Sequence, residues 1–172
     1  MNQRNYFIPI SLIVLGLFSS CSGPSEHNMT AVTNNAERNK ATALLIQQFV
    51  NAHQTDSMAN YMAADIVDYG DGSGPPLKTI DEVKGMLNSY FAAFPDVKQE
   101  NLNAIAEGNQ VAVFYDASGT FSGEIMGIKP TGKSFSVKDV DYFKFNDEGK
   151  IIEHRSIQLF STIFEQAGAE MK

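Results

Sequence analysis

The strongest constraint on the fold is a change of periodicity at Pro95. Before it, apolar residues recur every three or four positions, which is the spacing of amphipathic helices. After it, the apolar spacing shortens to two, the repeat of half-buried strands. Pro95 cannot continue a helix, so it separates the two regions. The chain therefore predicts an α+β domain, with N-terminal helices covering one face of a long, curved antiparallel meander.

Three helices and five strands follow from these patterns. Thr79 and Glu82 stand at the spacing of a capping box, which places the start of the third helix. Gly108-Asn109 and residues 146–149 are turn signals, so four of the strands form two hairpins joined by a glycine-rich loop. The expected elements are helices over residues 36–53, 56–64 and 79–94, and strands over residues 66–69, 97–107, 111–120, 134–146 and 150–160.

The N-terminal segment has the pattern of an export signal. One basic residue, Arg4, precedes an apolar run from Tyr6 to Phe18, and small residues follow. The run is too short for a bilayer-spanning helix, which needs about 20 residues. We expect a signal peptide over residues 1–20, a flexible polar tether over 21–35 and one folded domain over 36–172.

The composition excludes several classes of function. Without Arg4, 12 of the 13 basic residues remain against 20 acidic ones, a net charge of −8 after signal removal. An acidic chain without a basic run argues against nucleic acid as a partner. A single cysteine allows no internal disulfide and no thiolate zinc site. The three histidines are far apart in the sequence, so neither a metal site nor a cofactor is expected.

Cys21 is the most specific residue of this segment. It ends the run LGLFSSC (residues 15–21), which resembles the lipobox of bacterial lipoproteins. The resemblance implies cleavage before Cys21 and acylation of its thiol and amine, so the domain would be anchored to a bacterial membrane and face the periplasm or the cell exterior. Two or more acyl chains give stable anchoring. The alternative is an ordinary secretory signal followed by an incidental cysteine.

Five short motifs then occur in order along the second half of the chain. They are FPD at 94–96, EGNQV at 107–111, GTFSGE at 119–124, GIKPTGK at 127–133 and GKIIEH at 149–154. Together they resemble the SnoaL-like polyketide cyclase or ester cyclase family, over about residues 36–168. The resemblance implies the cone-shaped fold of the nuclear-transport-factor-2-like superfamily, in which three helices wrap a curved sheet around one pocket. Such cones often form homodimers through the outer face of the sheet.

The resemblance also implies where catalytic groups should lie. The family removes a proton next to a carbonyl with an aspartate in the last strand. That position falls on Leu159 here, and a family histidine falls on Phe121. Two further positions of the family pocket depart from the pattern, at Tyr69 and Arg155. Hydrocarbon thus stands where the resemblance predicts two proton-moving groups.

Asp139 and Asp141 are the acids that strand periodicity directs toward the core. Val137 and Phe143 share their parity, so all four should point to one side of the sheet. Two carboxylates in such a place could shuttle a proton. Alternatively, the acids lie at a bulge or a strand edge, where both are solvated or paired. Counting across the last hairpin turn pairs Asp141 with Arg155 in a salt bridge.

His154 is the remaining acid–base candidate. Its side chain titrates near neutral pH, yet its expected parity is opposite to the pocket side, which favours a structural role. The expected function is binding of a small, mostly apolar molecule in the cone. An active cyclase or isomerase and a dimerising scaffold are the alternatives. Candidate catalytic residues are Asp141 and His154, and candidate ligand-binding residues are Tyr69, Tyr90, Phe94, Tyr115, Phe121, Arg155 and Leu159.

Overall fold

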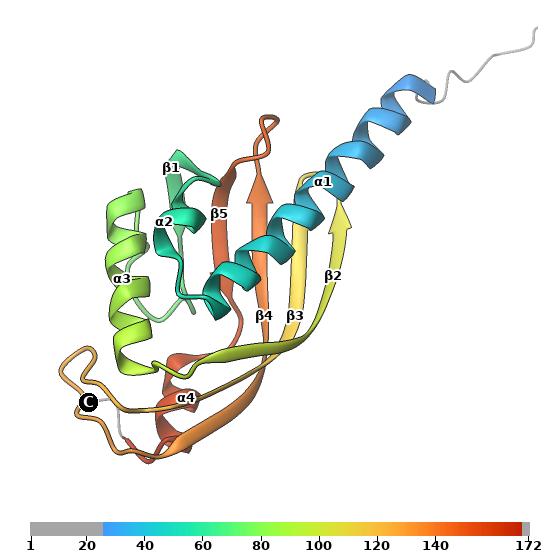
Figure 1. Cartoon of the computed structure of the whole chain (residues 1–172). Helices are drawn as coiled ribbons and strands as arrows, with labels where there is room; N and C mark the ends of the chain where they lie inside the picture. The colour runs from blue at the N-terminus through green and yellow to red at the C-terminus, as the bar shows by residue number, and fades with distance from the viewer. Residues whose placement is uncertain (1–25, 170–172) are drawn as a thin grey trace, which may run out of the picture.

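The computed structural model describes residues 26–169 and confirms the predicted α+β class. Helices and strands alternate at first, and a long meander follows (Figure 1). The elements are α1 (Glu26–Asn51), α2 (Thr55–Ala59), β1 (Met62–Asp68), α3 (Ile80–Ala93), β2 (Lys98–Glu107), β3 (Gln110–Thr120), β4 (Ser134–Phe145), β5 (Ile151–Ser156) and α4 (Phe160–Gln166).

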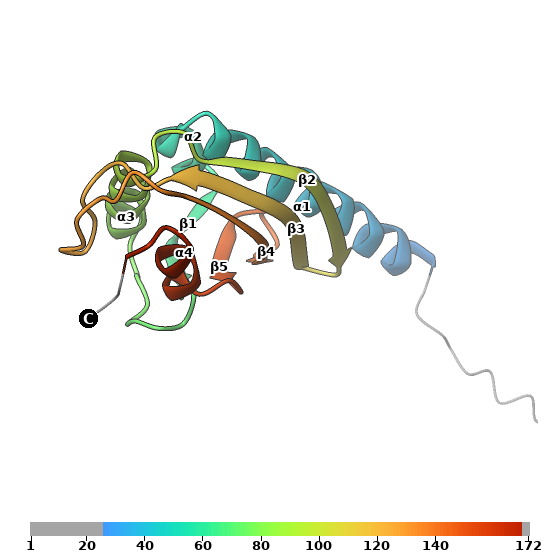
Figure 2. The same ribbon diagram turned by 90° about the horizontal axis from the view of Figure 1, so that it is seen from below.

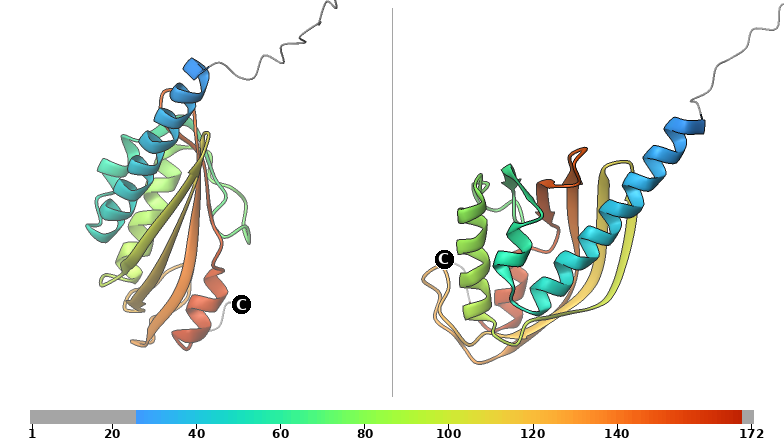
Figure 3. Two further views of the ribbon diagram at one scale, coloured as in Figure 1. Left: turned by 90° about the vertical axis from the view of Figure 1, so that its right-hand side faces the viewer. Right: turned by 45° about the horizontal axis from the view of Figure 1, so that its top comes forward.

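One five-stranded sheet carries the fold, in the order β1-β5-β4-β3-β2. Strands β2 to β5 are antiparallel neighbours, as the two hairpin signals predict. The edge strand β1 differs, because it pairs in parallel with β5 and makes the sheet mixed. Helices α1, α2 and α3 lie together on one side of the curved sheet (Figure 3).

The first helix is longer than its apolar stripe. It begins at Glu26 rather than near residue 36, so the part of the expected tether from residue 26 onward is helical. Periodicity detects only the stripe that packs on the domain, and a polar helical extension leaves no such signal. Among residues 26–169, no helix is both long and apolar enough to cross a membrane. The expected signal peptide and Cys21 lie outside the described residues.

The second helix ends and the first strand begins earlier than the sequence indicates. Helix α2 stops at Ala59, and Met62 already pairs with Ile151 of β5. The tripeptide from Met62 to Ala64 has helix-forming residues, but pairing with the neighbouring strand overrides that weak local preference. The expected helix over 56–64 is therefore too long.

The local signals around α3 are confirmed. The hydroxyl of Thr79 accepts from the backbone N–H of Glu82, and the Glu82 carboxylate accepts from the N–H of Thr79 at 3.1 Å. Both halves of the capping box are thus present. At the other end, the helix stops at Ala93, two residues before Pro95, because a proline cannot donate the next helical hydrogen bond.

The C-terminal segment departs from the prediction. Strand β5 ends at Ser156, not Phe160, and the chain then forms α4, which packs against β4 (Figure 2). The signal for this helix is present at Phe160, Ile163, Phe164 and Ala167, which recur at three- and four-residue spacing. Ile163, Phe164 and Ala167 are buried.

An aromatic cluster closes the end of the core near α4. Phe94 stacks on Phe121 with ring centroids 5.4 Å apart, and it meets Phe135 edge-on at 5.3 Å. Phe164 of α4 packs edge-on against Phe121 at 5.3 Å. All four rings are at most 3% exposed, so this cluster holds α3, the meander and α4 together.

The loop after β3 passes close to the end of α3. The backbone N–H groups of Ser122 and Gly123 both donate to the carbonyl of Ala93, at 2.8 and 3.0 Å. A Cβ at Gly123 would lie 2.3 Å from the carbonyl oxygen of Ala92. Only glycine permits this approach.

We therefore expect Gly123→Ala to lower the free energy of unfolding by about 1–3 kcal/mol, because the backbone must move to admit the methyl group. Urea unfolding measures the change. Gly85→Ala is the matched control, since nothing lies within 4 Å of its Cβ position in α3. That variant should gain about 0.5–1 kcal/mol from helix propensity. Equal effects of the two variants would contradict the close approach.

A candidate acid–histidine site in the cone

A cavity of about 120 Å³ lies between the helices and the inner face of the sheet. Most of its wall is apolar and comes from every layer of the fold. Representative apolar residues are Ile46 of α1, Met58 of α2, Ile66 of β1, Val83 of α3, Phe143 of β4 and Ile163 of α4. The apolar stripes that form the helices thus also form the wall of the cavity.

The polar side of the cavity begins with two acids of β4. Asp141 stands opposite Val113 and Asp139 stands opposite Tyr115, in a register that runs without a break from Gln110 to Thr120. No bulge intervenes, so both carboxylates point inward and line the cavity. The inward parity read from the sequence is therefore correct, and the alternative of a solvated strand edge is not what the structure shows.

His154 of β5 joins two carboxylates from the strands on either side. Its Nδ1 lies 2.9 Å from Oδ1 of Asp68 on β1, and its Nε2 lies 3.5 Å from Oδ1 of Asp141 on β4. When the imidazole is charged, both ring nitrogens carry a proton, so one ring can interact with both carboxylates. The ring also packs on Phe143, with centroids 5.1 Å apart.

The two carboxylates set the charge state of the imidazole. Burial alone would lower the pKa of His154, but the negative charge of Asp68 and the hydrogen bonds to Asp141 and Asp68 raise that pKa well above its ordinary value. Burial raises the pKa of Asp68, yet the charge and hydrogen bond of His154 and the N–H of Gly70 lower it overall. The pair is therefore an imidazolium beside a carboxylate at neutral pH.

Asp141 is held by two further donors. Nε2 of Gln47 donates to Oδ2 at 2.8 Å, and the hydroxyl of Tyr115 lies 3.0 Å from Oδ1. The Tyr115 hydroxyl also lies 3.1 Å from Asp139, so it sits between the two acids. Ser156 Oγ donates to Asp139 at 2.9 Å. The acids are thus fixed by hydrogen bonds from α1, β3 and β5.

Two polar groups of the cavity wall lack a hydrogen-bond partner among residues 26–169. Within residues 26–169, the hydroxyl of Tyr90 makes no hydrogen bond, although Tyr90 lines the cavity. Burial, followed by the charges of Asp141 and Asp139, raises the pKa of Tyr90 above its ordinary range, so it stays a donor. The side-chain oxygen of Gln99 is buried and has no partner among the described residues.

Arg155 does not hold Asp141, contrary to prediction. It is exposed, its Nε donates to Glu153 at 2.9 Å, and its guanidinium lies 3.8 Å from the ring centre of Tyr69. The reason is a register shift: Phe145 pairs with Ile151 but Lys144 pairs with Glu153, which leaves an extra residue in β5. That bulge moves His154 to the inner face and Arg155 to the outer face.

Four other expected ligand-binding residues also lie away from the cavity wall. Leu159 is 48% exposed at the start of α4, because the strand that would have turned it inward ends at Ser156. Phe94 and Phe121 fill the aromatic cluster, and Tyr69 packs under Arg155. Of the seven candidates, Tyr90 and Tyr115 line the cavity, as do both catalytic candidates, Asp141 and His154.

Sequence reasoning missed the three residues Gln47, Asp68 and Ser156. Gln47 is a fully buried polar residue inside the apolar stripe of α1, an interruption that the sequence does show. Asp68 is 4% exposed, and it reaches His154 only through the parallel pairing of β1 with β5. No hairpin signal could reveal that long-range pairing. Among residues 26–169, no group of three acidic, histidine or cysteine side chains is placed to hold a metal ion.

Comparison with known proteins agrees with this geometry. A family model described as "SnoaL-like polyketide cyclase" matches residues 40–167. The chain belongs to this family. No curated protein matches it.

Several solved structures are also similar to this chain. AclR of Streptomyces galilaeus, proposed to be a hydroxylase, has 28% identity over 77% of this chain and 82% of its own, with a TM-score of 0.65. IdmH of Streptomyces antibioticus, a proposed polyketide cyclase, has 25% identity over 76% and 98%, with a TM-score of 0.63. A proposed polyketide cyclase of Xanthomonas campestris pv. campestris shares the fold, with 17% identity over 77% and 98% and a TM-score of 0.70.

The charge on His154 predicts a pH-dependent contribution to stability. Because its folded pKa is raised, this contribution is complete below the ordinary histidine pKa of about 6.5 and is lost as the pH rises through the higher folded value. The lowered pKa of Asp68 has the opposite sign, so its contribution is lost as the pH falls through its folded value. Between about pH 4 and 6.5, both contributions are present.

A double-mutant cycle with His154→Gln and Asp68→Asn measures this coupling. We expect a coupling free energy of about 1.5–3 kcal/mol at pH 5.5, which declines in the alkaline range. Urea unfolding of the four proteins at each pH supplies the values. A coupling that stays constant into the alkaline range would contradict the charged pair.

Proposed function

We propose that the domain binds one small, mostly apolar molecule in its cone and transfers a proton on it, as a cyclase or isomerase does. The observation that carries the proposal is the position of His154 between Asp68 and Asp141 on a mostly apolar cavity wall. A carboxylate in such a place is protected from water and faces the bound molecule.

The reaction would begin at the carboxylate of Asp141. It takes a proton from a carbon next to a carbonyl, and the electrons of that C–H bond form the enolate. The hydroxyl of Tyr90, which faces the cavity, donates a hydrogen bond to the enolate oxygen. Return of the proton at another carbon gives an isomer. Alternatively, the enolate carbon attacks a second carbonyl and closes a ring, and the alkoxide formed there takes the proton back from Asp141. The imidazolium of His154 holds Asp141 in place throughout.

A second candidate is a binding module without catalysis. Both oxygens of Asp141 already accept hydrogen bonds, from Gln47 and from Tyr115. Both oxygens are therefore engaged within the protein, which leaves less of the carboxylate free to contact a bound molecule. The hydrocarbon at Phe121 and Leu159, where the family resemblance predicts proton-moving groups, supports the same candidate.

Hydrogen exchange into solvent tests proton transfer without knowledge of the product. Cyclohexanone and similar small ketones are incubated with the protein in D2O, and the loss of the protons next to the carbonyl is followed by NMR. We expect wild type to accelerate exchange, Asp141→Asn to abolish the acceleration, and Tyr90→Phe to lower it about 10- to 100-fold.

Asp116→Asn is the control for this experiment, because Asp116 is bound to Lys138 and does not line the cavity. It should exchange like wild type. Ketones that bind without accelerated exchange would overturn the catalytic proposal in favour of the binding module. Exchange that survives in Asp141→Asn would remove Asp141 as the base.

We further propose that the domain is exported and held on a bacterial membrane by lipid on Cys21. The support is the short apolar run followed by two serines and Cys21. Cys21→Ala should release the protein from the membrane fraction, because acyl chains supply the membrane affinity. Ser22→Ala keeps the cysteine and should fractionate as wild type. Membrane retention of the Cys21→Ala protein would show that the assignment is wrong.

A further inference from the structure

The cavity has an excess of negative charge. Asp68, Asp139 and Asp141 line it, and His154 is the one basic side chain of its described wall. Three carboxylates against one imidazolium leave a formal charge of −2. Hydrogen bonds stabilise these carboxylates but bring no second positive charge, so the site favours a bound cation.

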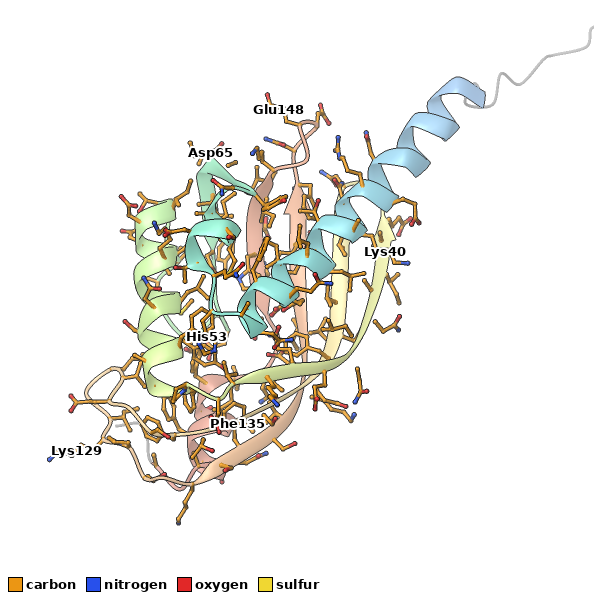
Figure 4. All side chains as sticks on the ribbon, in the orientation of Figure 1. Lys40, His53, Asp65, Lys129, Phe135 and Glu148 are labelled. Atoms are coloured by element: carbon orange, nitrogen blue, oxygen red, sulfur yellow. The ribbon has the colours of Figure 1, made fainter. Side chains whose placement is uncertain are left out.

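The basic side chains of the described chain are engaged or placed elsewhere. Arg155 is bound to Glu153 and Lys138 to Asp116, both on the outside of the sheet. Lys40 and Lys129 extend from the outside of the molecule, on α1 and on the loop between β3 and β4 (Figure 4). No lysine or arginine of residues 26–169 lines the cavity.

Two buried amide oxygens lie at or near the site. The side-chain oxygens of Gln47 and Gln99 are both buried, and neither has a hydrogen-bond partner among the described residues. Gln47 is fully buried and donates its amide to Asp141, while Gln99 lines the cavity. Of the two, only Gln99 lines the cavity, so an N–H group of a ligand beside Gln99 would restore the free energy that its unmatched oxygen loses.

The apolar wall suits a cation as well. Tyr90, Tyr115, Phe143 and Phe160 contribute aromatic side chains to it. The face of an aromatic ring attracts ammonium groups, most strongly where water is excluded. The size is limited: an apolar cavity of about 150 Å³ holds benzene, and this one measures about 120 Å³.

We propose that the molecule bound in the cone is a small organic amine, with a compact apolar body of about one ring and a positively charged nitrogen beside Asp141 and Asp139. This rests on the proposed function only in requiring that the cone binds a small, mostly apolar molecule. It holds whether or not a proton is then transferred.

Cyclohexylamine and cyclohexanol test the proposal, because they match in shape and differ in charge. Both are titrated by calorimetry into the full chain in a mild detergent. We expect the amine to bind about tenfold more tightly than the alcohol. Asp141→Asn should weaken amine binding about tenfold and leave alcohol binding within about twofold of wild type. Asp116→Asn, which removes a carboxylate outside the cavity, should change neither affinity.

Each outcome decides between the two proposals. Equal binding of amine and alcohol to wild type overturns the amine proposal and leaves binding in the cone intact, and this comparison needs no variant. Amine binding that persists unchanged in Asp141→Asn also overturns it. If neither compound binds, the proposed binding of a small molecule in the cone fails with it.

Discussion

The ion pair between His154 and Asp68 is the interaction on which the arrangement of the site depends. It joins the parallel edge strand β1 to β5, and through Asp141 it reaches β4, so one imidazole connects three adjacent strands. An acid in an apolar wall is costly unless its charge is matched. Part of that match is internal, since His154 lies 2.9 Å from Asp68 and 3.5 Å from Asp141, and Gln47 donates to Asp141 from α1. The helix, the edge strand and the meander are therefore positioned by the same polar group of residues.

Local chemistry in the sequence predicted the architecture and the two acids of β4. The capping box at Thr79, the stop at Pro95 and the alternation through Val137, Asp139 and Asp141 each depend on neighbours within a few residues. Strand parity is reliable wherever pairing is continuous, and β3 pairs with β4 without a break. For these elements, local preference and tertiary structure agree.

The sequence predictions were wrong where a bulge, a strand end or a long-range strand pairing determines which way a side chain points. The bulge in β5 places His154 on the inner face of the sheet and Arg155 on the outer face, and no local pattern in residues 150–156 predicts it. The end of β5 at Ser156 removes Leu159 from the sheet, because Gln158 donates its N–H to Asp139 and the chain turns into α4. Asp68 could be placed only by knowing that β1 lies beside β5. A shift of one residue was enough to reverse the roles of two candidate site residues.

The positions of Phe121 and Asp141 follow from one physical requirement. Phe121 is fully buried between the rings of Phe94 and Phe164, where a polar side chain would have aromatic neighbours on both sides. Asp141, also buried, has Gln47, Tyr115 and His154 around it as donors. A titratable group is therefore stable at one of these places and not at the other. Any chemistry in this cone has to start from the wall formed by β1, β5 and β4, because that is where the described chain supplies both acids and the donors that hold them.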